Sequence, residues 1–115
     1  MEFFKRLKLR CIWSWEGVVA TWRNEYSFRS WVWANMVSAL LAFAFPLTPA
    51  ERAVILGLGI LVLAAELINT AIEDAVDYIS TDEHPLAKRA KDAGSAGVAV
   101  AAIAVGVAWL IILIG

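Results

Sequence analysis

Apolar residues form one mixed amino-terminal segment and three longer apolar segments. In residues 2 to about 30, aromatic and aliphatic side chains are interspersed with lysines, arginines and glutamates. A helix that lies in the membrane interface needs this combination of aromatic anchors and basic groups. We therefore predict an amphipathic surface helix over residues 1–30, with an amphipathic helix packed against protein as the alternative.

The three apolar segments predict membrane spans. Residues 31–47 are short for a span, because crossing a hydrocarbon core of about 30 Å takes about 20 helical residues. Residues 52–79 predict a helix of roughly 42 Å at 1.5 Å per residue, so its last turns should project into the cytoplasm as an extension. Residues 94–115 are rich in glycine, alanine and serine, which is typical of close helix contact in a bundle.

These segments together predict an all-α membrane protein with one domain, residues 1–115. It contains a surface helix (1–30), three transmembrane helices (31–47, 52–79 and 94–115) and a cytoplasmic loop (80–93). Composition agrees, since 61% of the 115 residues are hydrophobic and a water-soluble domain of this size could not bury them. The net charge of −1 gives no reason to expect a nucleic-acid partner.

The basic residues predict the orientation in the membrane. Of the 10 lysines and arginines, all but Arg52 lie before the first predicted span or between the second and third. By the positive-inside rule, the amino terminus and residues 80–93 are cytoplasmic and the carboxyl terminus is outside. Any chemistry should therefore face the cytosol.

Polar residues interrupt the second predicted span on one face. Glu66, Asn69 and Glu73 are spaced i, i+3 and i+7, and Asp77 follows one turn later. An ionisable group within a span is costly and suggests function by default. Glu66 is a candidate proton acceptor. The alternative is a carboxylate that faces the bundle and bonds to Asn69 or to a neighbouring helix.

Charged residues near the cytoplasmic surface suit a metal ion and phosphate. Glu73, Asp74, Asp77 and Glu25 could supply the hard oxygen ligands that Mg²⁺ prefers. Lys88, Arg89 and Lys91 carry positive charge that suits phosphate. Solvated helix ends and charges that only set topology are the alternatives. The chain has neither a GxxxxGK[ST] nor a GxGxxG motif, so the residues predict phosphoryl transfer or ion coupling without choosing between them.

Two motifs identify a family resemblance. ELINTAIE at 66–73 and HPLAKRAKDAGSA at 84–96, with WRNEYSFR at 22–29 and WEG at 15–17, resemble the bacterial integral-membrane diacylglycerol kinase family. The resemblance runs from about Phe4 almost to the end of the chain. It implies a surface helix and three spans assembled as a homotrimer with shared active sites, in the bacterial inner (cytoplasmic) membrane.

The resemblance also implies a reaction and a set of roles. The reaction is transfer of the γ-phosphate of ATP, with Mg²⁺, to the hydroxyl of diacylglycerol, giving phosphatidic acid. Glu66 matches the catalytic base, and Glu25 and Glu73 match the ligands of the divalent ion. The implied nucleotide-contacting positions are Arg6, Trp13, Glu25, Glu73, Asp82, Glu83, His84, Lys91 and Asp92. The implied lipid-binding positions are Trp22, Ser30, Glu66, Asn69 and Ser95.

The choice of substrate leaves alternatives open. The HPLAK segment is similar to the undecaprenol-using branch of the family, and RAKDAGSA is similar to the diacylglycerol-using branch. We expect diacylglycerol, with undecaprenol as the alternative. Trp13, Ser30, Trp31 and Asp74 depart from the family pattern. A small ion-coupled transporter or a non-catalytic membrane subunit would also carry a glutamate in the membrane, and it predicts no ATP turnover.

Overall fold

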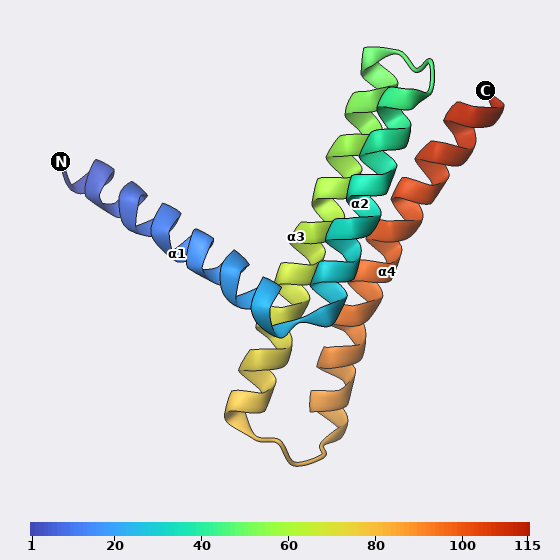
Figure 1. The fold of residues 1–115 in the computed structure, drawn as a ribbon. Coiled ribbons are helices and arrows are strands. Elements are labelled where there is room, and N and C mark those ends of the chain that lie inside the picture. The colour runs from blue at the N-terminus through green and yellow to red at the C-terminus, as the bar shows by residue number, and fades with distance from the viewer.

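The computed structural model describes residues 1–115 and contains four helices and no strands. They are α1 (Glu2–Asn24), α2 (Tyr26–Ala44), α3 (Pro49–Ile79) and α4 (Pro85–Ile114). Helices α2, α3 and α4 form an elongated bundle, and α1 projects from its side with the amino terminus far from the bundle (Figure 1). The all-α prediction is confirmed.

The break between α1 and α2 corrects the predicted limit of the surface helix. It falls at Glu25, which has an extended backbone with φ −117° and ψ 109°, and not near residue 30. Two side chains satisfy carbonyl groups at the end of α1: Asn24 donates to the Ala20 carbonyl at 2.8 Å, and Arg29 donates to the carbonyls of Trp22 and Arg23. We call Glu25, with the helix ends on either side of it, the elbow.

Proline-containing caps begin α3 and α4. The Thr48 side chain accepts from the Glu51 backbone N–H, and the Glu51 carboxylate accepts from the Thr48 N–H, with Pro49 in the first turn of α3. His84 Nδ1 accepts from the Leu86 N–H at 3.1 Å, with Pro85 in the first turn of α4. The predicted loop over 80–93 is therefore wrong beyond residue 84, because Pro85 starts a helix there.

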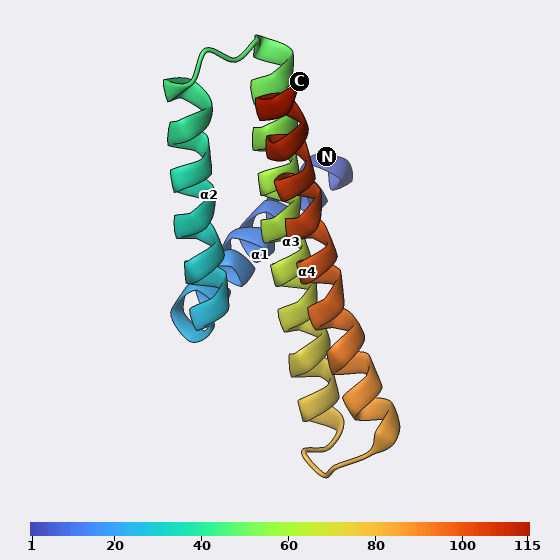
Figure 2. The ribbon, with the colours of Figure 1, turned by 90° about the vertical axis from the view of Figure 1, so that its right-hand side faces the viewer.

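Helix α3 is the centre of the bundle, packing against α4 and α2 and touching α1 only near the elbow. Ile55 and Val62 of α3 are almost fully buried. At Gly59 there is no room for a side chain, since an added Cβ would overlap the Asn35 amide of α2. Figure 2 shows α2 running alongside α3, and Figure 1 shows the last part of α4 leaning away from α2 and α3 toward the carboxyl terminus.

Tryptophan and arginine side chains fasten the end of the bundle that lies far from the elbow. Trp109 Nε1 of α4 donates to Ser38 Oγ of α2 at 2.8 Å, and its ring meets Phe45 edge-on with centroids 5.9 Å apart. Arg52 Nε donates to the Ala42 carbonyl at 2.8 Å, which ties α3 to the end of α2. These contacts tie α2 to both α3 and α4 at that end of the bundle.

Most of the apolar surface of the bundle is exposed. Only 10 of 115 residues are buried, and Ile60, Ile103 and Leu110 are each at least 60% exposed. Such a surface suits lipid or another protein chain. Two helices, α3 and α4, are long and apolar enough to cross a membrane. The first predicted span, 31–47, lies mostly in α2, which is not one of them; its predicted end is wrong, because α2 ends at Ala44.

Candidate active site

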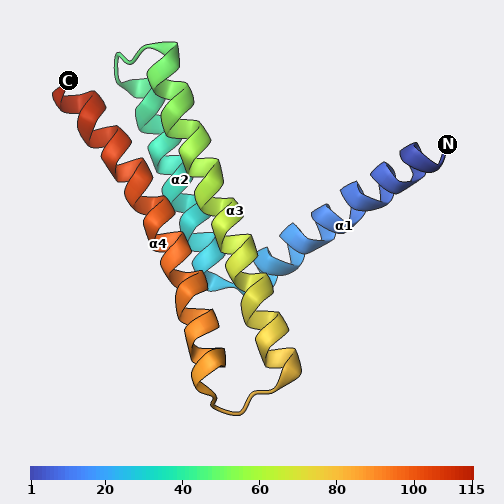
Figure 3. The same ribbon diagram turned by 180° about the vertical axis from the view of Figure 1, so that it is seen from behind.

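The candidate site lies where the elbow meets the middle of α3. Viewed from behind, the inner end of α1 reaches α3 about halfway along its length, and α3 continues past it toward the α3–α4 loop (Figure 3). Glu66 and Asn69 are both buried on α3 and Glu73 follows one turn later, so the predicted shared face is confirmed. The buried face points at the elbow and at the first part of α4.

Glu66 is bonded to the neighbouring helix. The hydroxyl of Ser27, in the first turn of α2, donates to Glu66 Oε2 at 3.2 Å. Glu66 is only 4% exposed, so its carboxylate lies in a desolvated position at the inner wall of the site. The Trp31 side chain of α2 is a second donor close to the same carboxylate, which still has lone pairs able to receive a proton from another group.

Asn69 connects α4 to Glu73. Its Nδ2 donates to Glu73 Oε1 at 2.7 Å, and its Oδ1 is buried without a hydrogen-bond partner. That oxygen lies against Gly94 of α4, where an added Cβ would overlap it. The close approach of α4 at Gly94 therefore sets where the Asn69 amide sits, and with it the Glu73 carboxylate.

Glu25 faces the carboxylates of α3. Burial is the main cause that raises the pKa of Glu25 above its ordinary value of 4.5, and the negative charges of Glu73, Asp74 and Glu66 raise it further. The structure thus brings the elbow carboxylate close to those predicted on α3. Such a cluster is electrostatically unfavourable by itself and would be relieved by a cation.

The donor set fits a metal ion that is shared with phosphate. No group of three or more histidine, cysteine, aspartate or glutamate side chains is close enough to hold a metal ion unaided. Mg²⁺ is usually held by one or two carboxylates together with substrate phosphates. Glu25 and Glu73 therefore suit Mg²⁺ that arrives with a nucleotide, and not a resident structural metal.

A hollow of about 790 Å³ lies at the α3–α4 loop and the start of α4. It gathers four of the residues implied for nucleotide contact, namely Asp82, Glu83, His84 and Lys91. Lys91 Nζ also pairs with Asp77 of α3 at 2.5 Å, which joins α3 and α4 near the loop between them. Asp92 does not line this hollow, although its partner Lys88, one turn earlier on α4, does.

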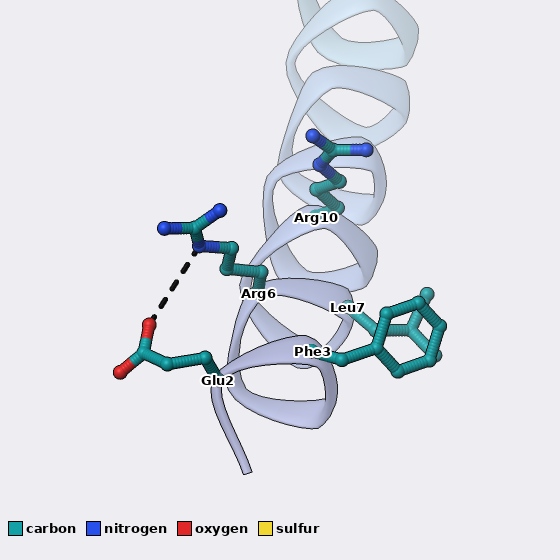
Figure 4. A pocket seen from close by; sticks show the side chains of 5 residues that line it. All are labelled: Glu2, Phe3, Arg6, Leu7 and Arg10. Carbon is teal, nitrogen blue, oxygen red and sulfur yellow. Dashed lines mark ion pairs between the residues drawn. The ribbon is translucent and has the colours of Figure 1, made fainter.

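Two residues implied for nucleotide contact lie elsewhere in the chain. Arg6 is on the outer part of α1, where its Nε is 3.7 Å from Glu2 Oε2 and where it lines a surface hollow with Phe3, Leu7 and Arg10 (Figure 4). Trp13, also on α1, is 60% exposed. Because α1 projects away from the bundle, a single chain does not bring Arg6 to the hollow at the α3–α4 loop.

The residues implied for lipid binding fall into two places. Trp22 lies near the elbow with its ring centroid 6.4 Å from that of Trp33, and Ser30 Oγ donates to the Tyr26 carbonyl one turn earlier. Ser95 is exposed on α4, next to the Gly94 that contacts Asn69. Glu66 and Asn69 lie on α3 between these two groups.

The sequence analysis missed Ser27 and Arg29 as site residues. Ser27 is 39 residues from Glu66, and no local spacing indicates a contact over that distance. Arg29 was considered only as one of the basic residues that set topology. Their closeness in sequence to Glu25, about one helical turn, could have indicated that both residues lie near the site.

A carboxylate at the elbow faces those of α3, and the apolar helical bundle also carries a lysine-containing hollow. These are features of a membrane-bound phosphotransferase. The family described as "Prokaryotic diacylglycerol kinase" matches residues 12–113. The chain therefore belongs to the prokaryotic diacylglycerol kinase family, and it is a lipid kinase. This membership argues against the transporter and non-catalytic alternatives.

Individual relatives agree with the family assignment. The diacylglycerol kinase of Pseudomonas aeruginosa is 42% identical over 99 residues, which is 86% of this chain and 80% of that protein. The diacylglycerol kinase of Escherichia coli K12 is 36% identical over 110 residues, or 96% of this chain and 90% of that protein. The diacylglycerol kinase of Helicobacter pylori 26695 is 35% identical over 106 residues, or 92% and 83%.

Proposed function

We propose that the protein transfers the γ-phosphate of ATP to the hydroxyl of diacylglycerol and forms phosphatidic acid. The observation that carries the proposal is the buried Glu66 carboxylate, held by Ser27 beside the carboxylates of Glu25 and Glu73. Several relatives that match most of this chain are named for diacylglycerol, which favours that lipid over undecaprenol.

In the proposed reaction, Glu66 accepts the proton of the lipid hydroxyl. The alcohol oxygen attacks the γ-phosphorus, the bond from that phosphorus to the bridging oxygen breaks, and ADP leaves. Mg²⁺, when bound with ATP, supplies positive charge for the phosphates. Glu25 and Glu73 would hold it, and Asn69 fixes the position of Glu73. The contribution of the protein is mainly positioning and electrostatic stabilisation.

The proposed nucleotide position is the hollow at the α3–α4 loop. Lys91 would exchange its partner Asp77 for phosphate oxygens when ATP binds, and Asp82, Glu83 and His84 line the same hollow. Arg6 and Trp13 lie on the projecting α1, and a second copy of the chain would allow them to approach this region. A homotrimer with shared sites is therefore part of the proposal, and light scattering of the active detergent complex tests it.

The proposed location is the bacterial inner membrane, with the amino terminus and the active site facing the cytoplasm. The apolar α3 and α4 would span the bilayer, and α2 would form a third span beside them. Exposed tryptophans and basic residues on α1 support its place at the membrane surface.

The direct test is ATP-dependent phosphorylation of diacylglycerol and of undecaprenol, compared in mixed micelles at equal surface concentration. We expect diacylglycerol to give the higher kcat/KM. A preference for undecaprenol would overturn the substrate assignment and keep the reaction class. Absence of phosphate transfer to either lipid by folded, oligomeric protein would overturn both.

A further inference from the structure

We propose that Ser27 is a positioning residue for Glu66. Its hydroxyl holds the carboxylate in an orientation in which Glu66 can receive the proton of the lipid alcohol. The inference rests on the proposed function, in which Glu66 is the base.

The contact joins two helices at the site. Ser27 Oγ, in the first turn of α2, donates to Glu66 Oε2 at 3.2 Å, and the Ser27 side chain is exposed while Glu66 is 4% exposed. A glutamate has three rotatable side-chain bonds, so a buried carboxylate that is not held would distribute between orientations. Ser27 therefore selects one orientation at the boundary between the buried wall and the accessible part of the site.

The elbow fixes the donor. Arg29, in the same first turns of α2, donates to the carbonyls of Trp22 and Arg23 at the end of α1. Phe28, next to Ser27, is 4% exposed and anchors this turn in the bundle. Because the turn is held at both sides, the position of the Ser27 hydroxyl relative to α3 is set by the fold and not by a mobile side chain alone.

A neutral donor suits this task better than a cation. A lysine or arginine that paired with Glu66 would orient it by a charge-assisted bond, but it would also stabilise the ionised carboxylate strongly and make it a weaker base. A serine hydroxyl provides direction with a smaller electrostatic effect. Ser27 can therefore fix the orientation of the Glu66 carboxylate while leaving it basic enough to accept a proton.

The test compares Ser27→Ala, Ser27→Thr and the control Ser38→Ala by steady-state kinetics. Ser38 is on the same helix and also makes an interhelical hydrogen bond, to Trp109, but at the far end of the bundle. We expect Ser27→Ala to lower kcat about five- to tenfold with the KM for MgATP unchanged within about twofold. Ser27→Thr, which keeps the hydroxyl, should recover most of kcat, and Ser38→Ala should keep kcat within about twofold of wild type.

Infrared spectroscopy gives a second measurement that does not depend on turnover. Ser27→Ala should shift a carboxylate stretching band that is missing in Glu66→Gln, and Ser38→Ala should leave that band in place. This comparison decides the matter even if one variant assembles poorly in the activity assay.

Three results would overturn the inference. They are full kcat in Ser27→Ala, an equal loss of kcat in Ser38→Ala, and an unshifted carboxylate band in Ser27→Ala. The proposed function fails in a distinguishable way, because it requires the wild-type protein to phosphorylate lipid. If wild type is active and Ser27→Ala behaves identically, only the role of Ser27 is wrong.

Discussion

Asn69 and Gly94 meet where α3 and α4 approach most closely at the site. The Asn69 Oδ1 atom rests on the Gly94 backbone without a hydrogen-bond partner, while Nδ2 of the same side chain donates to Glu73 Oε1 at 2.7 Å. The position of α4 therefore determines where the Asn69 amide lies, and the amide in turn determines where the Glu73 carboxylate lies. Gly94, which has no side chain, therefore affects the proposed metal site through Asn69.

A methyl group at position 94 should disturb Glu73. Gly94→Ala would push the Asn69 amide away, so the KM for MgATP should rise several-fold, whereas stability should change little because the flexible Asn69 side chain can shift and alanine favours a helix more than glycine. Gly97→Ala is the matched control, because an added Cβ there meets nothing within 4 Å. Kinetics at varied MgATP and thermal unfolding in detergent measure both effects. Equal behaviour of the two variants would contradict the proposed role of the Asn69–Gly94 contact.

Removing the guanidinium of Arg29 should loosen the elbow. Arg29→Ala leaves the carbonyls of Trp22 and Arg23 without a donor, which should cost about 1–2 kcal/mol and weaken MgATP binding through displacement of Glu25. Arg23→Ala removes the same charge from an exposed residue in the preceding helix and should have little effect. Thermal unfolding and the KM for MgATP are the measurements. If Arg23→Ala destabilises as much as Arg29→Ala, the effect is one of net charge and not of the elbow.

Neutralising Glu25 should have opposite effects with and without metal. In a chelator at neutral pH, Glu25→Gln should raise the melting temperature, because it removes a charge that burial disfavours and that Glu73, Asp74 and Glu66 repel. With MgATP present, the same variant should gain less stability than wild type, because it lacks a ligand. Glu16→Gln, on the exposed surface of α1, is the control and should change neither value.

The pH dependence of that effect follows from the direction of the shift. Since the pKa of Glu25 in the folded state is raised above 4.5, the cost of its ionised form grows as the pH rises from about 4.5 and is complete above the folded-state pKa. Well below pH 4.5 Glu25 is protonated in both the folded and the unfolded state, so the advantage of Glu25→Gln should disappear. An advantage that persists below that pH would show that the variant stabilises by another route.

The proposed topology is tested by cysteine accessibility. Cys11 is exposed and must first be replaced by serine. Cysteines placed at Lys5 and Lys88 should then react only with reagents on the cytoplasmic side, and one at Ala50 only from the periplasmic side. Labelling of all three from the same side would contradict the three-span arrangement.

The features that could be predicted from the sequence are those that depend on the helical repeat. Glu66, Asn69 and Glu73 share a face because their spacing follows the helix repeat, and the long α3 follows from an uninterrupted segment. The elbow at Glu25 was not predicted, because neither glycine nor proline occurs there and the break depends on side-chain bonds from Asn24 and Arg29. The predicted loop over 80–93 includes Pro85, although with His84 this residue begins α4.

Contacts between distant segments were beyond sequence reasoning. The Ser27–Glu66 bond depends on how the elbow places α2 against α3, and the Lys91–Asp77 pair depends on how α3 and α4 converge at the loop. Arg6 was expected at the nucleotide site, and the projecting α1 explains why one chain cannot bring it there. The fold class and the candidate residues could be predicted from the sequence. Which side chains contact one another could not, because those contacts depend on how the helices pack.

The central claim is that Glu66 is the base and Glu73 a metal ligand, so the two variants Glu66→Gln and Glu73→Gln should fail differently. The measurement is steady-state kinetics at varied lipid, ATP and Mg²⁺, with each variant first shown to be folded and oligomeric. Glu66→Gln should lower kcat on the order of 10²- to 10⁴-fold with nearly unchanged MgATP affinity. Glu73→Gln should weaken apparent MgATP affinity and recover part of its rate in excess Mg²⁺. Near wild-type turnover in Glu66→Gln, or a loss of lipid affinity alone in both variants, would contradict the account.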